Sequence, residues 1–394
     1  MINPKELIDK VTVEEFIETA EKYYHVVSDP TPLMSKPFAF MHEAPEMLQN
    51  MGLLLSGLHL GKTMTVLDFG AGTCWLSRYL NQLQCRTISC DVSETALEIG
   101  KDLFKKYPII GNLVAEPVFL HFTGHQLELP DKSIDRIVCF DALHHIPNLA
   151  EVFRELARVL KNGGIAGFSE PGRNHSQTPQ SQYEMKNHKA LENDINVDEI
   201  FSIAQKAGFT DFSCKVLCNM ELSLNQYDLL FKEEDKKALK DDIWNNIHDT
   251  MFNRNIFFLY KGKFIPDSRS HIGLAHSIEI KKENYSVKRG RKLKLSFKIS
   301  NTGEAKWLNT GLANIGIVRL ASHLYDSDKN LISVDFSRDD LPKSVMPGET
   351  ISHKIFLELP GRGSYRLVFD MVSDGVTWFE NVGSKPVYIT VHVT

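Results

Sequence analysis

Two glycines and two acids with a definite spacing are the residues of this chain best suited to bind a nucleotide. The run Val-Leu-Asp-Phe-Gly-Ala-Gly-Thr places Asp68, Gly70 and Gly72 directly after a short apolar stretch. A ligand can lie against the backbone there, because glycine has no side chain and tolerates unusual torsions. A helix expected to begin near Trp75 adds free amide donors. Asp91 lies nineteen residues after Gly72, where a carboxylate can accept both hydroxyls of a ribose.

The rest of the glycine pattern separates two classes of nucleotide ligand. A dinucleotide-binding turn carries a third glycine, three residues after the second, for close packing of helix on strand. In this chain Trp75 stands at that position. The pattern therefore does not favour NAD or FAD.

Three histidines and a glutamate are the candidates for general acid–base chemistry. His144 and His145 follow a predicted strand. Glu170 follows the next predicted strand, and His175 comes five residues later. Because open α/β sheets bind ligands at the carboxyl ends of their strands, we expect these side chains near the nucleotide. His145 is the preferred general base, Glu170 and His175 are alternatives, and structural packing is the competing interpretation.

A metal site is not predicted. Glu192 and Asp194 offer two carboxylates, but their spacing is not diagnostic of a metal. Cys214 and Cys218 lie four residues apart, and no matching Cys or His pair follows at metal-finger spacing. We therefore expect metal-independent chemistry and reduced, mostly buried thiols.

Short apolar runs alternate with amphipathic segments and must position these side chains. Strands are predicted at 65–69, 87–90, 134–139, 164–168, 212–217 and 256–260, and helices at 76–83, 94–106, 149–160, 197–207 and 233–251. Lys161-Asn162-Gly163 is expected to form the turn after the helix at 149–160. The alternation predicts a mostly parallel sheet with helices on both faces. Helical periodicity at 13–24 and 43–55 makes residues 1–57 an N-terminal helical segment of this domain, which continues over 58–265.

The pattern changes after a polar connector at residues 266–270. Alternating runs separated by turn residues follow at 292–299, 315–320, 331–336, 351–357, 364–372 and 387–393. Period-two strands at spacings of roughly ten residues favour an antiparallel β-sandwich. Residues 272–394 are therefore predicted to form a second, all-β domain.

Composition and charge limit the kinds of partner and the cellular location that we expect for this chain. The formal net charge of -5 gives no basic footprint, so nucleic acid is not an expected partner. The first residues lack the charged-then-apolar layout of a signal peptide. The apolar run at residues 51–60 is too short to span a bilayer. We expect a cytoplasmic protein without a membrane span.

The spacing of the acids and glycines resembles that of class I methyltransferases. The resemblance runs from about Thr65 to Gly172 and has four parts in order. These parts are the acid-x-Gly-x-Gly run, Gly124-His125-Gln126 with the following Leu-Pro-Asp segment, residues 137–145 with the fourth strand and its loop, and residues 156–164 before the fifth strand. The resemblance implies a doubly wound, mostly parallel seven-stranded sheet, with S-adenosylmethionine as the cofactor.

The resemblance also implies roles for individual residues. It implies that Asp68, Gly70 and Gly72 line the methionine and ribose of the cofactor and that Asp91 binds the ribose. It also implies that His125 and Gln126 contact adenine and that Asp141 lies near the cofactor's amino group. This sequence departs from the family at His125, where an acid that accepts from the adenine amine is common. A neutral imidazole can donate or accept there, which leaves the geometry of the adenine contact in doubt.

Only the second domain indicates which molecule would accept the methyl group. The Asn301-Thr302-Gly303 turn followed by Trp307 resembles immunoglobulin-like domains beside glycosyltransferases and polysaccharide-export components. This resemblance implies methylation of a hydroxyl on a sugar, nucleotide sugar or polysaccharide intermediate. A small-molecule or lipid acceptor, and a non-catalytic scaffold, are the alternatives. Trp307, Trp378 and Phe379 either stack on sugar rings or fill the core, and the domain either contacts glycan or mediates self-association.

Overall fold

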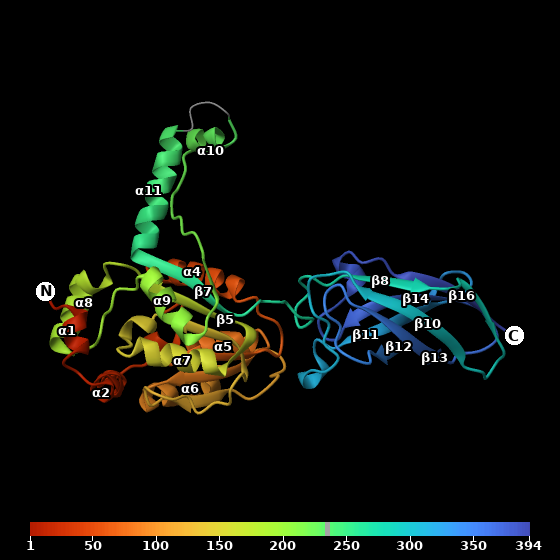
Figure 1. Cartoon of the computed structure of the whole chain (residues 1–394), viewed down its shortest axis with the longest axis horizontal. Coiled ribbons are helices and arrows are strands. Elements are labelled where there is room, and N and C mark those ends of the chain that lie inside the picture. Colours follow the sequence, from red (N-terminus) through yellow and green to blue (C-terminus); the bar gives the residue numbers. More distant parts are fainter. Residues whose placement is uncertain (233–236) are drawn as a thin grey trace. The chain divides into compact units, whose positions relative to one another are not determined.

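The structure is a computed structural model in which residues 1–232 and 237–394 are described. The chain divides into two compact units (Figure 1). The first comprises residues 1–60 and 64–264, and the second comprises residues 61–63 and 265–394. Each unit encloses its own buried apolar core.

A seven-stranded mixed sheet forms the middle of the first unit. Its strands are β1 (Thr65–Phe69), β2 (Arg86–Asp91), β3 (Val118–His121), β4 (Ile134–Phe140), β5 (Leu160–Pro171), β6 (Asp211–Cys214) and β7 (Arg254–Lys261). They lie in the order β3-β2-β1-β4-β5-β7-β6, and β7 runs antiparallel to both of its neighbours. All other neighbours are parallel. The predicted mainly parallel α/β fold is therefore confirmed.

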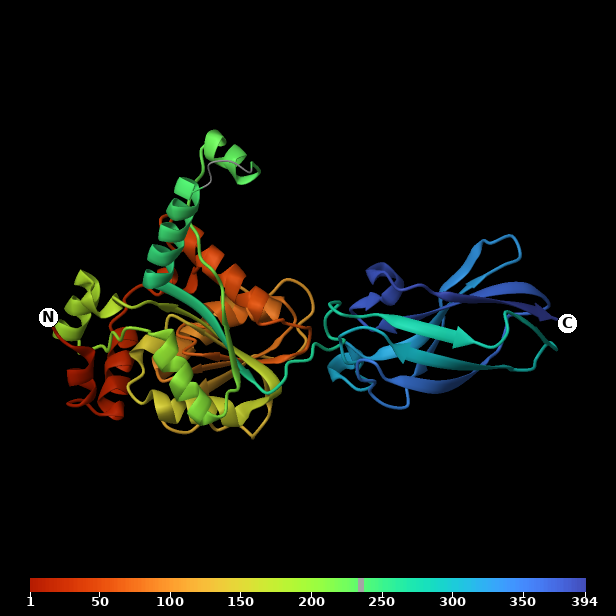
Figure 2. The same ribbon diagram turned by 45° about the horizontal axis from the view of Figure 1, so that its top comes forward.

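Helices cover both faces of this sheet (Figures 1 and 2). The described helices of this unit are α1 (Pro4–Ile8), α2 (Val13–His25), α3 (Thr31–Met34), α4 (Ala44–Gly57), α5 (Trp75–Gln82), α6 (Glu94–Lys106), η1 (Leu143–His145), α7 (Leu149–Val159), η2 (His175–Gln177), α8 (Pro179–Asn187), α9 (Val197–Ala207), α10 (Leu224–Leu230) and α11 (Lys237–Asn253), of which α10 and α11 project away from the sheet. Because side chains alternate along a strand, Leu67 joins the core with α7 and α9, whereas Val66 joins the core with α4 and α5. Among the described residues, no helix is long and apolar enough to cross a membrane.

Element boundaries differ from the prediction mainly around β5. The segment Leu160–Gly163, predicted to end a helix and turn, belongs to the strand, and within it Gly163 has a left-handed φ of 80°. Leu160 pairs with Ile134 across a register shift, so the strand begins as soon as α7 ends at Val159. Strand β6 ends at Cys214, three residues before the predicted end. Residues 233–236 of the helix predicted at 233–251 lie outside the described residues.

The second unit consists of two β-sheets around one core. A three-stranded sheet has the order β13-β10-β8, and a six-stranded sheet has the order β12-β11-β14-β16-β9, with β15 paired to β14. The elements are β8 (His276–Ile280), β9 (Asn284–Val287), β10 (Leu293–Asn301), η3 (Leu312–Asn314), β11 (Val318–Tyr325), β12 (Leu331–Asp340), β13 (Thr350–Leu357), β14 (Gly363–Ser373), β15 (Thr377–Trp378), η4 (Phe379–Val382) and β16 (Val387–Val393). Strand side chains from both sheets, including Leu295 and Leu367, meet in this core.

Two of the three aromatic residues proposed for sugar stacking lie in this core. The Trp307 and Phe379 side chains are fully buried, with ring centroids 5.5 Å apart. Neither ring can meet a sugar, so of the two alternatives core filling is confirmed for Trp307 and Phe379. Trp378 is half-buried and packs on His323, with 4.3 Å between ring centroids.

Candidate functional site

The turn between β1 and α5 brings the backbone close to neighbouring side chains. Gly70 and Gly72 have φ values of 72° and 50°, in the left-handed region that favours glycine. A Cβ on Gly70 would lie 2.3 Å from the Cβ of Ala142, and one on Gly72 would lie 2.8 Å from the hydroxyl of Tyr24. A larger side chain fits at neither position without displacing a neighbour. Glycine is therefore required at both positions by the backbone torsions and by the close approach of Ala142 and Tyr24.

Asp91 ends β2 beside this turn, and backbone amides fix its carboxylate. Its Oδ2 accepts from the Gly72 amide at 2.7 Å, and its Oδ1 accepts from the Ser93 amide at 2.9 Å. A carboxylate oxygen has two lone pairs, so each oxygen keeps one for a further donor. This arrangement suits the two hydroxyls of a ribose. Gly70, Gly72 and Asp91 are called the nucleotide turn below.

Asp68 lies beneath the turn and not on its surface. Its side chain is buried, and Oδ2 accepts from the hydroxyl of Ser77 at 2.6 Å. Ser77 in turn accepts from Ser89 of β2 at 2.7 Å. Burial raises the pKa of Asp68 to about 7. In this structure Asp68 therefore links β1, α5 and β2 below the position where the sequence expected ligand contact.

Helix α2 of the N-terminal segment covers the nucleotide turn. Its Glu21 accepts hydrogen bonds from the hydroxyls of Ser93, at 2.6 Å, and Thr95. The Tyr24 hydroxyl lies against Gly72, and burial raises the pKa of Tyr24 well above its ordinary value. Periodicity predicted this helix but not these contacts, because a periodic pattern shows which face is apolar and not what the helix covers.

His125 lies between two acids from different helices. Its Nε2 is 3.2 Å from Oε1 of Glu14 in α2, and its Nδ1 is 3.1 Å from Oε2 of Glu151 in α7. Hydrogen bonds to Glu14 and Glu151 raise the pKa of His125. The neighbouring Gln126 is exposed. Two acids, Glu14 and Glu151, therefore do lie beside residue 125, where this chain departs from the family pattern. They come from α2 and α7.

Asp141 directly follows β4 in a left-handed conformation, with φ of 51°. Its amide donates to the Ser169 carbonyl at 2.9 Å, and its carboxylate pairs with the guanidinium of Arg254, the first residue of β7. The sequence did not identify Arg254. The two residues are 113 positions apart, and no local pattern joins them.

His144 and Glu170 form a buried pair at the ends of β4 and β5. Nδ1 of His144 lies 2.8 Å from Oε2 of Glu170. The Glu170 carboxylate also accepts from the amides of Ala142 and Leu143, each at 3.0 Å, and its side chain is fully buried. Burial lowers the pKa of His144 well below its ordinary value. Glu170 thus orients the histidine loop and has no exposed surface of its own for an acceptor.

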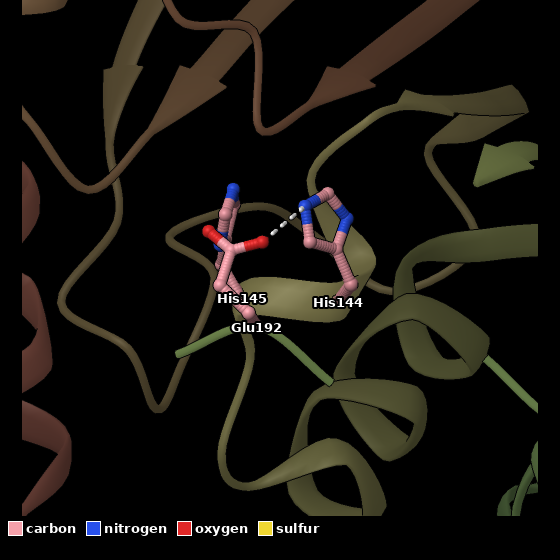
Figure 3. A group of neighbouring side chains, drawn as sticks. All are labelled: His144, His145 and Glu192. Carbon is pink, nitrogen blue, oxygen red and sulfur yellow. Dashed lines mark ion pairs between the residues drawn. The ribbon is translucent and has the colours of Figure 1, made fainter. Parts of the chain in front are cut away.

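His145, His175 and Glu192 complete a cluster around His144, and Figure 3 shows His144, His145 and Glu192. The ring centroid of His144 lies 3.9 Å from that of His145 and 4.8 Å from that of His175. Nε2 of His175 lies 2.6 Å from Oε2 of Glu192, and Nδ1 of His145 lies 2.6 Å from the Leu191 carbonyl. Burial alone raises the pKa of Glu192, but the hydrogen bond from His175 and the nearby histidine charges hold it below its ordinary value.

These four residues, called the histidine cluster below, lie beside the nucleotide turn. Ala142, which closes over Gly70, precedes His144 by only two residues. Burial raises the pKa of Asp91, and the charge of His145 is one of the influences that oppose this rise. The structure therefore brings His145 and His175 together near the turn, as the sequence expected, and adds Glu192 to them.

A family model for the methyltransferase domain matches residues 67–168. A probable S-adenosylmethionine-dependent methyltransferase of Mycobacterium tuberculosis is 27% identical over 150 residues, which are 37% of this chain and 48% of that protein. Demethylmenaquinone methyltransferase of Tropheryma whipplei is 31% identical over 111 residues, which are 27% of this chain and 43% of that protein. The chain thus spans about half the length of the curated relatives it matches.

Solved structures are similar at lower identity. Phosphoethanolamine N-methyltransferase 2 of Haemonchus contortus has a TM-score of 0.45 and 16% identity, over 64% of this chain and 60% of that one. The family match indicates a methyltransferase domain in residues 67–168, and the relatives support S-adenosylmethionine as its cofactor. The matched range contains the nucleotide turn, His144 and His145, and ends before Glu170, His175 and Glu192.

Proposed function

We propose that this chain is an S-adenosylmethionine-dependent methyltransferase that methylates a hydroxyl of a sugar, nucleotide sugar or polysaccharide intermediate. The observation that carries the proposal is the nucleotide turn next to the histidine cluster. The family match over residues 67–168 supports the same class of reaction.

The residues of the turn fit the cofactor. Asp91 offers one free lone pair on each oxygen toward the ribose hydroxyls, while the Gly72 and Ser93 amides keep the carboxylate oriented. Gly70 and Gly72 have the left-handed torsions of a tight turn, and Ala142 and Tyr24 pack against them. When bound, S-adenosylmethionine supplies an electrophilic methyl group on a sulfonium.

The histidine cluster is the acceptor side of the proposal. Methyl transfer depends on alignment of the nucleophile with the methyl group, and a hydroxyl nucleophile must also lose its proton. His145 is the exposed member of the cluster, with 47% of its side chain accessible, while His144 and Glu192 are buried. An acceptor hydroxyl therefore meets His145 first. Glu170 acts through His144 as a positioning residue.

A sugar acceptor is favoured by the polar character of this side. The proposed acceptor region contains the imidazoles of the histidine cluster, the carboxylate of Glu192 and the hydroxyl of Ser181, which lies 3.3 Å from Oε2 of Glu192. The resemblance of the Asn301-Thr302-Gly303 turn to domains of glycan-handling proteins points the same way. The relatives support a second candidate, because one of them is a methyltransferase named for demethylmenaquinone. A small-molecule or quinone-like acceptor is therefore the alternative.

Transfer of a labelled methyl group tests the proposal. Purified full-length protein is incubated with methyl-labelled S-adenosylmethionine and a panel of nucleotide sugars, oligosaccharides and quinols. We expect label on a sugar hydroxyl with wild type and none with Asp91→Ala. The matched control is Asp102→Ala, which removes an exposed carboxylate on α6. Label on a quinol alone would favour the alternative, and absence of any cofactor binding would overturn both.

A further inference from the structure

The histidine cluster brings together more potential metal ligands than acid–base catalysis needs. His144, His145 and Glu192 each offer one nitrogen or oxygen atom, and these three atoms all lie within 4.8 Å of one another. Figure 3 shows the three side chains turned toward one another. They come from η1, which follows β4, and from the loop after α8.

Hydrogen bonds fix which nitrogen of His144 is available. Oε2 of Glu170 accepts from the backbone amide of His144 at 3.4 Å and lies 2.8 Å from Nδ1 of His144, so we assign it as the acceptor toward that nitrogen. Nδ1 therefore carries the ring proton, and Nε2 carries the lone pair. Nε2 lies 4.0 Å from Oε2 of Glu192, and within residues 1–232 and 237–394 no donor reaches it at hydrogen-bonding distance. Two electron-rich atoms thus face each other across a short gap.

His145 is held in a similar way. Its Nδ1 lies 2.6 Å from the carbonyl of Leu191. A carbonyl can only accept, so Nδ1 donates and Nε2 keeps the lone pair. Leu191 immediately precedes Glu192, so one short segment positions both His145 and the carboxylate.

His175 orients the carboxylate of Glu192. Its Nε2 lies 2.6 Å from Oε2 of Glu192, and Ser181 donates to the same oxygen at 3.3 Å. Metal-binding side chains are commonly held by such outer hydrogen bonds, of which the carboxylate–histidine pair is the best-known form. Here Glu170 accepts a hydrogen bond from His144, the Leu191 carbonyl accepts one from His145, and His175 is hydrogen-bonded to Glu192.

We infer that His144, His145 and Glu192 bind a divalent transition-metal ion, although the sequence predicted metal-independent chemistry. Two imidazoles and one carboxylate with open positions are a donor set used for Zn²⁺ and Fe²⁺. Two atoms that each lie about 2.0–2.2 Å from zinc are at most about 4.4 Å apart. Nε2 of His144 lies 4.0 Å from Oε2 of Glu192, within this limit, and the three ligand atoms all lie within 4.8 Å of one another, so only a small contraction is required.

The role of the ion in catalysis rests on the proposed function, whereas its binding does not. Because the side chain of His145 is 47% exposed, an oxygen ligand can approach a bound ion from that side. A hydroxyl bound to a divalent ion loses its proton more readily than a free hydroxyl. The acceptor class favoured by this site is then a molecule with a hydroxyl or diol that can coordinate the ion.

Direct binding of Zn²⁺ and Co²⁺ tests the site without any methyl acceptor. Chelator-treated, dialysed full-length protein is titrated with Zn²⁺ by calorimetry, and the visible absorption of bound Co²⁺ reports nitrogen and oxygen coordination. We expect one equivalent to bind, with an affinity reduced about 10- to 100-fold in Glu170→Gln, which changes only an outer partner. Glu192→Gln and His145→Ala should lose the binding.

The control is His248→Ala. Nδ1 of His248 lies 3.1 Å from the carboxylate of Asp249, so this exposed pair offers a histidine and an acid outside the cluster. Wild-type affinity in His248→Ala supports the assignment. If Glu192→Gln does not fold, the half-exposed His145→Ala decides. Absence of stoichiometric binding in wild type, or unchanged binding in His145→Ala, would overturn the metal site.

The same samples are titrated with S-adenosylmethionine. Cofactor binding without metal binding would overturn the metal site alone and leave the proposed function standing. Stoichiometric Zn²⁺ binding, lost in His145→Ala, without cofactor binding would overturn the proposed function and leave the metal site standing. The two failures are therefore distinguishable.

Discussion

The nucleotide turn and the histidine cluster are adjacent, but the chain builds them in different ways. The turn is made within residues 65–91, a single β-α-β segment. The cluster takes its members from η1, η2 and the loop after α8, and its supporting Glu170 from β5. Local chain geometry therefore forms the turn, whereas the cluster requires the sheet and its following loops to be folded.

Both regions fix a carboxylate with backbone amides, yet the two carboxylates have different surroundings. Asp91 accepts from Gly72 and Ser93 and keeps lone pairs for a ligand. Glu170 accepts hydrogen bonds from the amides of Ala142 and Leu143 and from the His144 ring, so its carboxylate is occupied by donors of the protein itself. The same structural device thus orients a carboxylate that we propose binds the cofactor in one region, and a carboxylate that orients a histidine in the other.

The largest expected effect comes from removing the support of the histidine cluster. Glu170→Ala leaves two buried amides and the Nδ1 proton of His144 without an acceptor, so the free energy of unfolding should fall by about 3–5 kcal/mol. Chemical unfolding of the first unit measures it. Glu151→Ala, which removes a more exposed acid, should cost below about 1 kcal/mol. Equal losses in the two variants would contradict a supporting role for Glu170.

A second test concerns Asp68, the buried acid beneath the nucleotide turn. Its pKa of about 7 lies above the ordinary value, so the folded protein keeps a proton that the unfolded chain releases from about pH 4 upward. Stability from this group is present at low pH and is lost as pH rises toward 7. Asp68→Asn cannot titrate, so its stability relative to wild type should rise by up to about 4 kcal/mol between pH 4 and 8. A pH-independent difference in unfolding free energy would show that Asp68 is not held protonated.

Asp91→Ala addresses the ligand-binding side of the comparison. Loss of two charge-assisted hydrogen bonds to a ribose should weaken S-adenosylmethionine and S-adenosylhomocysteine binding at least about 100-fold, or about 3 kcal/mol. Calorimetric titration measures it, with Asp102→Ala as the unaffected control. An affinity within a few-fold of wild type would mean that the ribose is held elsewhere.

Site residues within one local segment could be predicted from the sequence, whereas contacts between distant segments could not. Gly70, Gly72 and Asp91 could be found because their spacing reflects backbone requirements within one β-α-β segment. The contact of Tyr24 with Gly72 and the pair of Asp141 with Arg254 could not, because each joins segments far apart in sequence. Glu192 was noticed as an acid, but its hydrogen bond to His175 depends on the path of the intervening chain.

The fold shows the same limit at β5. Alternation of apolar runs was enough to predict a mainly parallel sheet, since parallel strands buried on both faces are continuously apolar. The helix end was predicted to within one residue, but the start of β5 was wrong because Lys161-Asn162-Gly163 contains turn residues. Pairing of Leu160 with Ile134, a tertiary contact, overrides that local preference.

A smaller effect is expected from Gly72→Ala. The new Cβ would lie 2.8 Å from the Tyr24 hydroxyl at a residue with φ of 50°, so both strain and displacement follow. We expect a loss of cofactor affinity of about 10-fold, from a penalty of about 1–2 kcal/mol. If the clash with Tyr24 contributes, Gly72→Ala combined with Tyr24→Phe should recover part of the loss. No recovery would assign the effect to the backbone alone.

The smallest effect on cofactor binding should come from the second unit, which contains its own buried histidine–carboxylate pair. His276 and Asp370 are both fully buried, and Asp370 also accepts from the Glu380 amide at 2.9 Å. Asp370→Asn keeps the shape and removes the charge, so it should destabilise the second unit. The units have separate cores, so S-adenosylmethionine affinity should change by less than about twofold. A tenfold loss in a folded variant would show that the units are energetically coupled, which would make the second unit part of the binding machinery.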